Sequence, residues 1–588
     1  MNLPAERSTA APSWLEVIRG TAPILLIAPH GGSAGAAARA TLHPKVNDLE
    51  TAEITRELAA RLDAVALINR AMDRNQVDCN RVSQLIERAP VLLTLIADEA
   101  ARLATAHPCV TILLIHGWNI IEPRIDLGLG LKDARGHLRA PSNACISASD
   151  AFIQDRVGPL ATRLERAGIA PTFGLRYPGA GAQNLLQAFT TRHADSAVPS
   201  LRRLADLAGR GCLNALQLEL SVAVRIAGPY RSRAIAAITQ TFLSDAGEET
   251  PRRAISVIRA PRPPAPRPAR IEAPAPAFRI GLEFFDADQK LGGMASFDFG
   301  ANAAGGRIMM LLERRRVALF TGEGGAALDG DRLALGPLTF ACAASAGAID
   351  FRGPAVVVED GTAYLSVENA LRAGRLDPQM AIVARLEFDD QGEGLGALLA
   401  ALSRHTDERP EVLPPPRFGR LRGSVRLDGR ERPLAAVARV GLAFTGLGPQ
   451  QFQERRMLWA CVRDGATAAI ETRSVSRADG SVHTDASFLR AGEWYRVRLQ
   501  SLDLATGSPS LAPPQIAATF SGEACGSLEL TGVPETMMAL SRPGAKGARV
   551  LTSLGFAAYA IAGRPAVGMY EYSRTVTAPT PSRGPTAR

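Results

Sequence analysis

The sequence predicts a two-part protein, in which an α/β domain precedes an all-β region. Three observations predict this division. Up to residue 245, short apolar runs alternate with amphipathic stretches, as in layered α/β folds. A stretch rich in Pro and Arg follows over residues 251–277. Beyond it, Asp-Gly pairs lie between alternating apolar segments, which is typical of β-hairpins, and no such pair occurs before residue 250.

The first domain is predicted over residues 1–250. Its buried strands are expected at 23–29, 64–69, 110–115 and 215–220, because each run is short, apolar and bounded by turn residues. Residues 48–62 carry apolar side chains at helical spacing, and a second helix over 151–167 is expected to end at Gly168. Ligands of such folds bind beyond the carboxyl ends of the strands.

The remaining segments are a linker, a β region and a tail. Repeated Pro removes backbone donors and favours extended conformations, so 251–277 is predicted to be a semi-rigid linker. Residues 278–572 are predicted to form one large or two tandem all-β barrels or sandwiches. Residues 573–588 are predicted to be a disordered tail. The chain of 588 residues is also too long for a single core.

The charge distribution bears on the partners of the protein. The formal net charge is +9, of which the linker supplies +5 and the tail +3, so the rest of the chain is almost neutral. We therefore expect no nucleic-acid partner. No run of 18 apolar residues predicts a membrane span, and the first residues lack the pattern of a secretory signal. Seven scattered Cys without a CxxC pair favour a reducing compartment, so the cytoplasm is the expected location.

Two histidines occupy equivalent positions at predicted strand ends. The first strand runs into Pro29-His30-Gly31-Gly32, and the third runs into His116-Gly117-Trp118. Between them, Asp48 and Glu50 open a predicted helix. Two imidazoles and one carboxylate with an open fourth position form the usual catalytic zinc set. The alternative for either histidine alone is an imidazole that only caps a strand or packs in a loop.

An ordered set of short motifs resembles the N-formylglutamate amidohydrolases, which are similar in fold to zinc carboxypeptidases. The resemblance covers roughly residues 12–245 and implies a mixed-sheet hydrolase fold for the first domain. Residue 33 is Ser, so the His-x-x-Glu of true carboxypeptidases is absent. The motifs that carry the resemblance are Pro29–Gly32, Asp48–Thr51, Val77–Arg81, Ile115–Trp118, Asp126–Gly128, Tyr177–Gly181 and Gln217–Leu220.

The resemblance implies a zinc-dependent amidohydrolase that cleaves an N-acyl amide of a small, carboxylate-bearing substrate such as an N-acyl amino acid. It implies that His30 and His116 bind Zn²⁺ together with Asp48, or with Glu50 as the alternative ligand. Glu219 matches the general base and acid of the family.

The same resemblance assigns the substrate contacts. Arg81 is expected to clamp a substrate carboxylate, and Asn80 and Arg176 are expected near the substrate. Asp78 and Asn80 are also expected to hold their loop.

A second catalytic interpretation stays open. Residues 31–35 fit the G-x-S-x-G nucleophile elbow, so Ser33 could act with Asp126 and either His137 or His193. Against it, this elbow follows the first strand of the domain, whereas the usual elbow follows several strands.

The β region resembles the lipocalin-like barrels of the carotenoid hydratase and AttH type over residues 419–446 and 567–574. The Arg-Asp-His-Ser-Trp-Gly segment of that family is missing. An alternative function follows: a non-catalytic binding protein whose β half captures an apolar ligand. Glu571 could be a carboxylate in that cavity or a surface residue of an edge strand.

Overall fold

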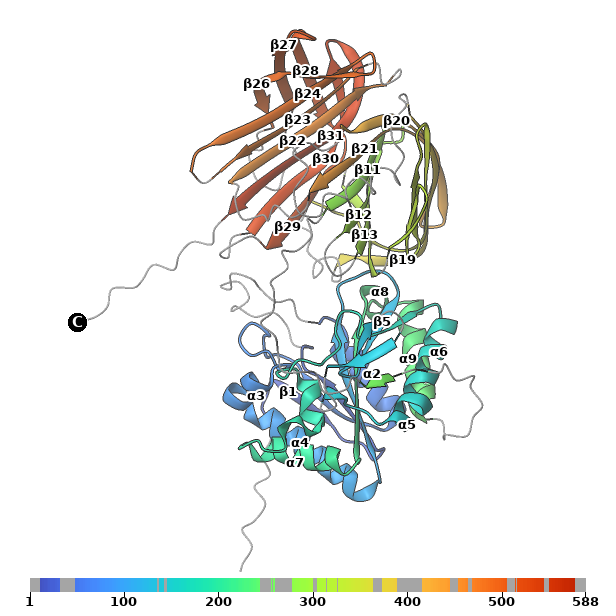
Figure 1. Ribbon diagram of the computed structural model, residues 1–588, viewed down its shortest axis with the longest axis vertical. Coiled ribbons are helices and arrows are strands. Elements are labelled where there is room, and N and C mark those ends of the chain that lie inside the picture. Colours follow the sequence, from blue (N-terminus) through green and yellow to red (C-terminus); the bar gives the residue numbers. More distant parts are fainter. Residues whose placement is uncertain are drawn as a thin grey trace, which may run out of the picture. The chain divides into compact units, whose positions relative to one another are not determined.

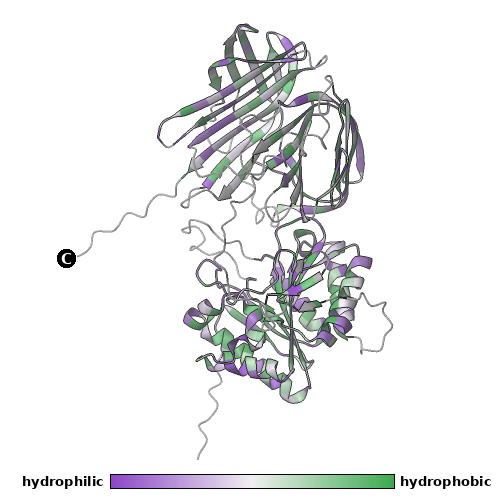
Figure 2. Cartoon of the chain, viewed as in Figure 1, coloured by the Kyte–Doolittle hydropathy of each residue, from purple (hydrophilic) through white to green (hydrophobic). Residues whose placement is uncertain are grey.

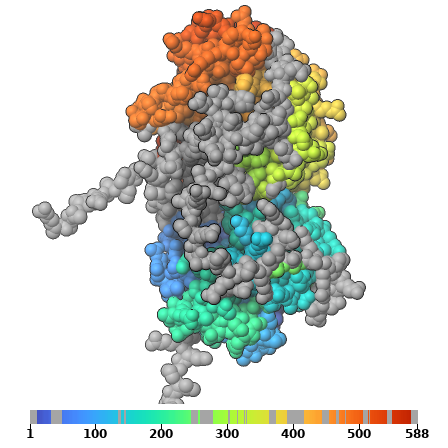
Figure 3. Space-filling view, viewed as in Figure 1, coloured from blue at the N-terminus to red at the C-terminus, as the bar shows by residue number. Residues whose placement is uncertain are grey.

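The computed structural model divides the chain into two compact units, residues 1–119 with 123–270 and residues 120–122 with 271–588. Each unit is a contiguous body, blue to green for the first and yellow-green to red for the second (Figures 1 and 3). The predicted succession of an α/β region and an all-β region is confirmed. The structure describes residues 11–31, 48–134, 137–141, 145–243, 255, 257–259, 278–299, 304–313, 315–324, 326–362, 373–388, 415–444, 453–463, 468–477, 479–504, 513, 515–543 and 549–576.

A seven-stranded sheet forms the centre of the α/β unit, in the order β1-β3-β2-β4-β9-β5-β8. The central strands β3, β2, β4 and β9 are parallel, and they contain the four strands predicted from the sequence. The pairs β1–β3 and β9–β5 are antiparallel, which makes the sheet mixed, and β5 runs parallel to the edge strand β8. The strands are β1 (Leu15–Ile18), β2 (Ile24–Ala28), β3 (Val65–Asn69), β4 (Val110–Gly117), β5 (Arg124–Gly128), β8 (Ala170–Phe173) and β9 (Leu213–Leu220).

Helices cover both faces of this sheet. Alternate residues of β2 therefore pack into two separate cores, one on each face. Ile24, Leu26 and Ala28 belong to the core under α2, α6 and α9, whereas Leu25 and Ile27 belong to the core under α3, α4 and α7. Figure 2 shows the apolar residues inside this unit and the polar residues on its helices' outer sides. The helices are α2 (Thr51–Leu62), α3 (Val82–Arg88), α4 (Pro90–Ala106), α5 (Asp150–Phe152), α6 (Gly158–Arg166), α7 (Pro199–Gly209), α8 (Val222–Arg225) and α9 (Pro229–Leu243).

A small three-stranded sheet includes part of the predicted linker. Its strands are β6 (Lys132–Ala134), β7 (His137–Ala140) and β10 (Val257–Arg259), and β10 runs parallel to β7. Ile255 is buried against the core of the α/β unit. The apolar residues Ile255 and Val257 pack against that core and therefore give the start of the segment 251–277 an ordered place, which its Pro and Arg content did not suggest. The other residues of that segment lie outside the described residues.

The first half of the β unit is a closed antiparallel barrel. The order β14-β13-β12-β11-β21-β20-β19-β18 closes through a pairing between β18 and β14, and β17, β16 and β15 extend the sheet from β18. The strands are β11 (Phe278–Asp286), β12 (Leu291–Phe299), β13 (Ala304–Leu312), β14 (Arg316–Gly324), β15 (Ala327–Asp329), β16 (Arg332–Leu335), β17 (Leu338–Cys342), β18 (Ala346–Val358), β19 (Arg375–Phe388), β20 (Arg417–Leu427) and β21 (Arg430–Phe444).

The second half of the β unit is a ten-stranded antiparallel sheet in the order β25-β24-β23-β22-β31-β30-β28-β27-β26, with β29 paired to β30. Strand β31 continues to Val576, beyond the start of the predicted tail, and residues 577–588 lie outside the described residues. The strands are β22 (Glu454–Val462), β23 (Ala468–Ser476), β24 (Val482–Arg490), β25 (Glu493–Arg496), β26 (Arg498–Asp503), β27 (Ile516–Gly522), β28 (Gly526–Pro534), β29 (Met538–Pro543), β30 (Arg549–Ile561) and β31 (Arg564–Val576).

The Asp-Gly pairs act as hairpin turns at most of the described positions. Between β20 and β21, Asp428 and Gly429 have φ angles of 54° and 71°, the left-handed pair that a two-residue hairpin needs. Gly330 and Gly480 also have positive φ in turns that join neighbouring strands. The pair at 360–361 makes no tight hairpin, because the Asp360 carboxylate instead accepts hydrogen bonds from Thr362. The pair at 464–465 lies outside the described residues.

Candidate functional site

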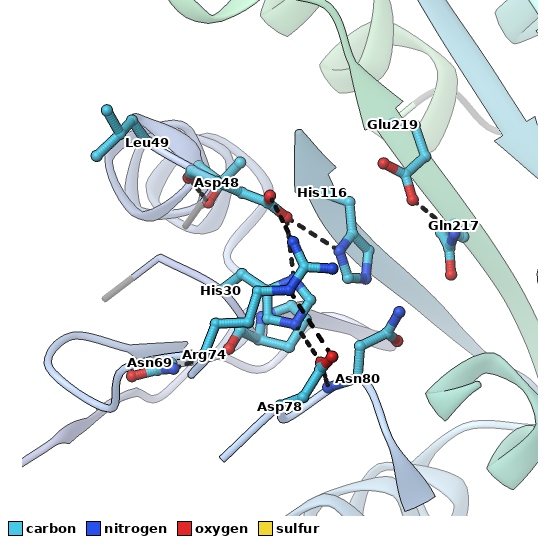
Figure 4. A network of polar contacts seen from close by, with 12 residues as sticks. His30, Asp48, Leu49, Asn69, Arg74, Asp78, Asn80, His116, Gln217 and Glu219 are labelled. Carbon is cyan, nitrogen blue, oxygen red and sulfur yellow. Dashed lines mark hydrogen bonds and ion pairs between the residues drawn. The ribbon is translucent and has the colours of Figure 1, made fainter. Parts of the chain in front are cut away.

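Three buried side chains converge at the carboxyl edge of the parallel strands. His30 follows β2, His116 lies near the end of β4, and Asp48 lies just before α2. One ligand atom from each lies within 4.8 Å of the other two. The Nδ1 atoms of His30 and His116 lie 3.1 and 3.2 Å from the same oxygen of Asp48, Oδ2 (Figure 4). Parallel topology explains the convergence, because it brings the ends of successive strands to one edge.

The other side of the His30 ring is held by a second carboxylate. Nε2 of His30 lies 2.8 Å from Oδ1 of the buried Asp78, so this nitrogen donates its proton there. In the neutral ring Nδ1 then carries a lone pair, and this lone pair faces the oxygen of Asp48. A neutral ring of this tautomer offers its lone pair to a cation shared with Asp48, whereas a protonated ring donates to Asp48 instead. A histidine oriented by a carboxylate on its far nitrogen is the usual arrangement of a metal ligand.

Charge and burial at the cluster agree with this geometry. Burial raises the pKa of Asp48, but the charge of His30 and the hydrogen bonds from both histidines outweigh it and hold the pKa well below its usual range. Burial lowers the pKa of His116, which favours the neutral imidazole that metals bind. Its Nε2 is buried with no hydrogen-bond partner among the described residues. The donors present therefore fit a divalent metal ion.

Glu219 lies on β9, beside His116 on β4, and the two residues are partners in the parallel register. Its side chain is buried, and Oε1 accepts a hydrogen bond of 2.7 Å from Nε2 of Gln217 (Figure 4). Burial, followed by the negative charges of Asp48 and Asp126, raises the pKa of Glu219 well above its usual range. A carboxyl group with a raised pKa can both give and take a proton near neutral pH.

Arg74 is a site residue that the sequence did not reveal. It follows β3, and its guanidinium lies 3.5 Å from Oδ1 of Asp48 and 3.8 Å from Oδ2 of Asp78. The side chain is 27% exposed, so it forms part of the wall between the buried cluster and the solvent. A single arginine in a loop carries no periodic or motif signal.

The structure separates the other predicted site residues from the cluster to different degrees. Glu50, the alternative ligand, points away and forms an ion pair of 2.9 Å with Arg231. Arg81 is 56% exposed and lies 4.0 Å from Asp78, so it belongs to the rim of the site. Asn80 donates its backbone N–H to Asp78, and its Oδ1 is buried with no partner among the described residues.

Arg176 is exposed, and the contact that the structure gives it is a backbone hydrogen bond to Asp126. The Asp126 carboxylate also accepts hydrogen bonds from the Thr172 hydroxyl and from the N–H groups of Leu175 and Tyr177. Asp126 therefore anchors the loop after β8, and both its oxygens are engaged. This occupancy speaks against Asp126 as the orienting acid of a Ser-His-Asp triad, and Ser33 itself lies outside the described residues.

Arg225 joins the segments that carry two cluster residues. This fully buried arginine of α8 donates to the carbonyl oxygens of Leu49, which follows Asp48, and of Trp118, which lies two residues after His116. Gly117 is required beside it, because a Cβ there would lie 2.6 Å from the Arg225 guanidinium. The glycine of the His-Gly-Trp segment thus has a packing role.

In the β unit, Glu571 forms an ion pair with Arg455 and accepts a hydrogen bond from Ser573. Its side chain is 13% exposed, and β31 lies inside its sheet between β22 and β30. The interpretation of Glu571 as a surface residue of an edge strand is therefore wrong.

No family model and no curated protein matches this chain. Solved structures similar to it include an AttH protein from Nitrosomonas europaea, at 12% identity and a TM-score of 0.33, over 52% of this chain and 94% of that one. Kievitone hydratase from Nectria haematococca matches at 9% identity and a TM-score of 0.30, over 52% and 90%. A gene product of Agrobacterium tumefaciens matches at 15% identity and a TM-score of 0.25, over 38% and 88%.

These similar structures include an AttH protein, the type that the sequence led us to expect for the β unit, whose barrel is shown by its own strand order. The comparisons correct the expected function. The expectation of a zinc amidohydrolase acting on N-acyl amides is wrong, because the named enzyme among these neighbours is a hydratase. The alternative of a non-catalytic protein that captures an apolar ligand gains only weak support from the barrel. No comparison supports the resemblance of the α/β unit to N-formylglutamate amidohydrolases. Among the described residues, no helix is long and apolar enough to cross a membrane.

Proposed function

We propose that the α/β unit binds a divalent metal ion of the zinc class on His30, Asp48 and His116, and that it is an enzyme that adds water to a polar substrate. The observation that carries the proposal is the pair of imidazole Nδ1 atoms facing one carboxylate oxygen at 3.1 and 3.2 Å. Two imidazoles and a carboxylate are the donors that zinc prefers in catalytic sites. Zinc in such a site supplies Lewis acidity, which makes water a nucleophile near neutral pH.

The surrounding residues have distinct tasks. Asp78 fixes the orientation and tautomer of His30. Glu219, buried beside His116, takes a proton from the attacking water and returns it to the substrate. Arg74 and Arg81 lie at the solvent side of the cluster, and their guanidinium groups favour a substrate that carries negative charge.

Metal content tests the proposal, with a control two residues away. The purified full-length chain is expected to carry one zinc ion, measured by elemental analysis. Asp48→Asn removes a ligand charge and is expected to lose the ion. Glu50→Gln removes the same charge from the same segment, but its ion pair is with Arg231, so it is expected to keep the ion. Equal metal content in the two variants, or none in the wild type, would contradict the proposal.

A second experiment separates metal binding from catalysis. Glu219→Gln keeps the size of the side chain and the acceptor for Gln217, so this variant is expected to bind metal normally. Hydrolysis of 4-nitrophenyl acetate, an activated ester that reports a nucleophilic water, is expected to fall by about 100-fold because a proton-transfer group is lost. An unchanged rate would exclude Glu219 from this role.

A further inference from the structure

A pocket rich in arginine lies at one end of the closed barrel in the β unit. Its volume is about 380 Å³, at the lower end of the range for small-molecule sites. The hairpin between β13 and β14, the hairpin between β20 and β21, and the start of β19 enclose it. The residues that line it are Leu312, Glu313, Arg316, Arg375, Val425, Leu427, Asp428, Arg430 and Arg432.

The pocket has an apolar side and a charged side. Leu312, Val425 and Leu427 are all buried, and the last two are separated by one residue on β20, so they face the same side of the sheet. The other lining residues carry charge. A site of this kind offers one part of a ligand an apolar contact and another part an ionic one.

The charges of the lining residues do not cancel. Four arginines face two carboxylates, those of Glu313 and Asp428, which leaves two positive charges (4 − 2). Glu359 also pairs with Arg316 and Arg375, and one positive charge remains when it is counted. An electrically unbalanced group of guanidiniums around a pocket attracts an anion.

The ion pairs show which arginines are available. The Asp428 side chain pairs with both Arg316 and Arg375, and the three side chains brace the pocket wall. The backbone N–H of Asp428 also donates to Asp377 at 2.6 Å, which fixes the turn. Arg432 pairs with Glu313 through Nη2 alone, whereas Arg375 pairs with Asp428 through both Nη1 and Nη2, so Arg432 keeps more of its donors for a ligand. Arg430 is exposed and forms no ion pair with the described residues. Arg430 and Arg432 are therefore the groups that a ligand can engage.

We propose that this pocket binds a small organic anion, in which a carboxylate or phosphate group is attached to a short apolar body. The anionic group lies on the guanidiniums of Arg430 and Arg432, which suit the two oxygens of such a group. The apolar body lies on Leu312, Val425 and Leu427. This binding site is independent of the metal centre proposed for the α/β unit, because all of its residues belong to the β unit.

Equilibrium dialysis of the full-length chain tests the proposal with four probes. Octanoate and octyl phosphate carry both parts of the ligand, 1-octanol lacks the charge, and inorganic phosphate lacks the apolar body. At least one of the two octyl anions is expected to bind at least about 10-fold more tightly than 1-octanol and inorganic phosphate do, since the charge and the apolar body each contribute to binding. Equal binding of octanoate, octyl phosphate and 1-octanol, or no binding of either octyl anion, would overturn it.

Two variants locate the binding. Arg430→Gln removes an exposed charge that braces nothing, and it is expected to weaken binding of the octyl anion by about 10-fold. Arg422→Gln removes an exposed charge from β20 outside the pocket, so it is the matched control and is expected to leave binding unchanged. Thermal unfolding of both variants checks that each is folded. Octanoate binding that is the same in the wild type and in both variants would show that the anion binds elsewhere.

Discussion

The two units bury charged groups in contrasting ways. In the α/β unit, His30 and His116 both face one oxygen of Asp48, and the three side chains together offer donor atoms to a metal ion. In the β unit, Arg439 lies between Glu283 and Glu471, with nitrogen–oxygen distances of 3.3 and 2.7 Å. The imidazole and carboxylate atoms of the first arrangement can bind a metal ion. In the second arrangement the carboxylate oxygens are already paired with the guanidinium of Arg439. Among the described residues, the group that could hold a metal is the one in the α/β unit.

Sheet topology accounts for the difference. Parallel strands end at one edge, so residues distant in sequence meet there without being neighbours in any ladder. Antiparallel strands place residues directly opposite each other, and Glu283 is the register partner of Arg439. Trp459 is likewise the partner of Glu471, and it donates its indole N–H to Glu283 at 2.6 Å. The β unit therefore gives each of these three charged side chains an oppositely charged partner.

The largest expected effect concerns Arg439. Burial opposes the charge of this arginine, but Glu471 and Glu283 outweigh burial and raise its pKa above the usual value. Arg439→Met leaves the part-buried carboxylates of Glu283 and Glu471 without their cation, and we expect it to lower the free energy of unfolding of the β unit by about 3 kcal/mol. Urea denaturation followed by tryptophan fluorescence measures this. The exposed Arg422→Met is the control. An equally small loss of stability in both variants would show that Arg439 does not stabilise the two carboxylates.

A smaller effect is expected at Asp126 in the α/β unit. Its two oxygens accept four hydrogen bonds from the loop after β8. Asp126→Asn replaces one acceptor by a donor that faces backbone N–H groups, so we expect a loss of about 2 kcal/mol of stability. Asp98→Asn breaks an exposed ion pair with Arg203 and is expected to cost less than about 1 kcal/mol. Chemical denaturation of both variants gives the comparison, and equal losses would count against the anchoring role.

The β20–β21 turn gives a third and weaker effect. A Cβ at Gly429 would meet no atom within 4 Å, and the same holds for Gly281 in β11, but only Gly429 has a positive φ, 71°. We expect Gly429→Ala to cost about 1 kcal/mol and Gly281→Ala to be neutral or slightly stabilising. Thermal melts of the two variants separate backbone conformation from packing. If both substitutions had the same effect, the left-handed turn would not be the cause.

The smallest effect is a dependence on pH. Burial raises the pKa of Glu283, and Arg439 only partly offsets this. An acid whose pKa is raised by folding binds its proton more tightly in the folded state, so its contribution to stability is present at low pH and is lost as the pH rises through the raised pKa. Glu283→Gln cannot ionise, so the variant does not lose this stability as the pH rises. The stability of the variant relative to the wild type should therefore be greater at pH 8 than at pH 4, and the opposite trend in urea titrations would contradict this pKa shift.

The sequence predicted the parts of the fold that depend on local pattern. The apolar runs became β2, β3, β4 and β9, and the Asp-Gly pair at 428–429 became a left-handed two-residue turn. The convergence of His30 and His116 followed from their equivalent positions at strand ends. The choice between Asp48 and Glu50 as the ligand could not be predicted from the sequence. Glu50 has a φ of 70° and pairs with Arg231, and no sequence pattern encodes that backbone angle.

Contacts that depend on tertiary packing were beyond the sequence. Arg74 reaches the cluster from a loop. Arg225 donates hydrogen bonds to Leu49 and Trp118, which both lie more than 100 residues earlier in the chain. The arginine pocket combines hairpins near residues 313 and 428, which come together only when the barrel closes. Such groups have no period or spacing that a sequence could show.

Anomalous X-ray scattering at the zinc edge, from crystals of the full-length chain purified without chelator, tests the metal centre most directly. The account predicts one strong anomalous peak between Nδ1 of His30, Nδ1 of His116 and the carboxylate of Asp48. Crystals that show no peak there, or that show a peak only at other residues, would contradict it.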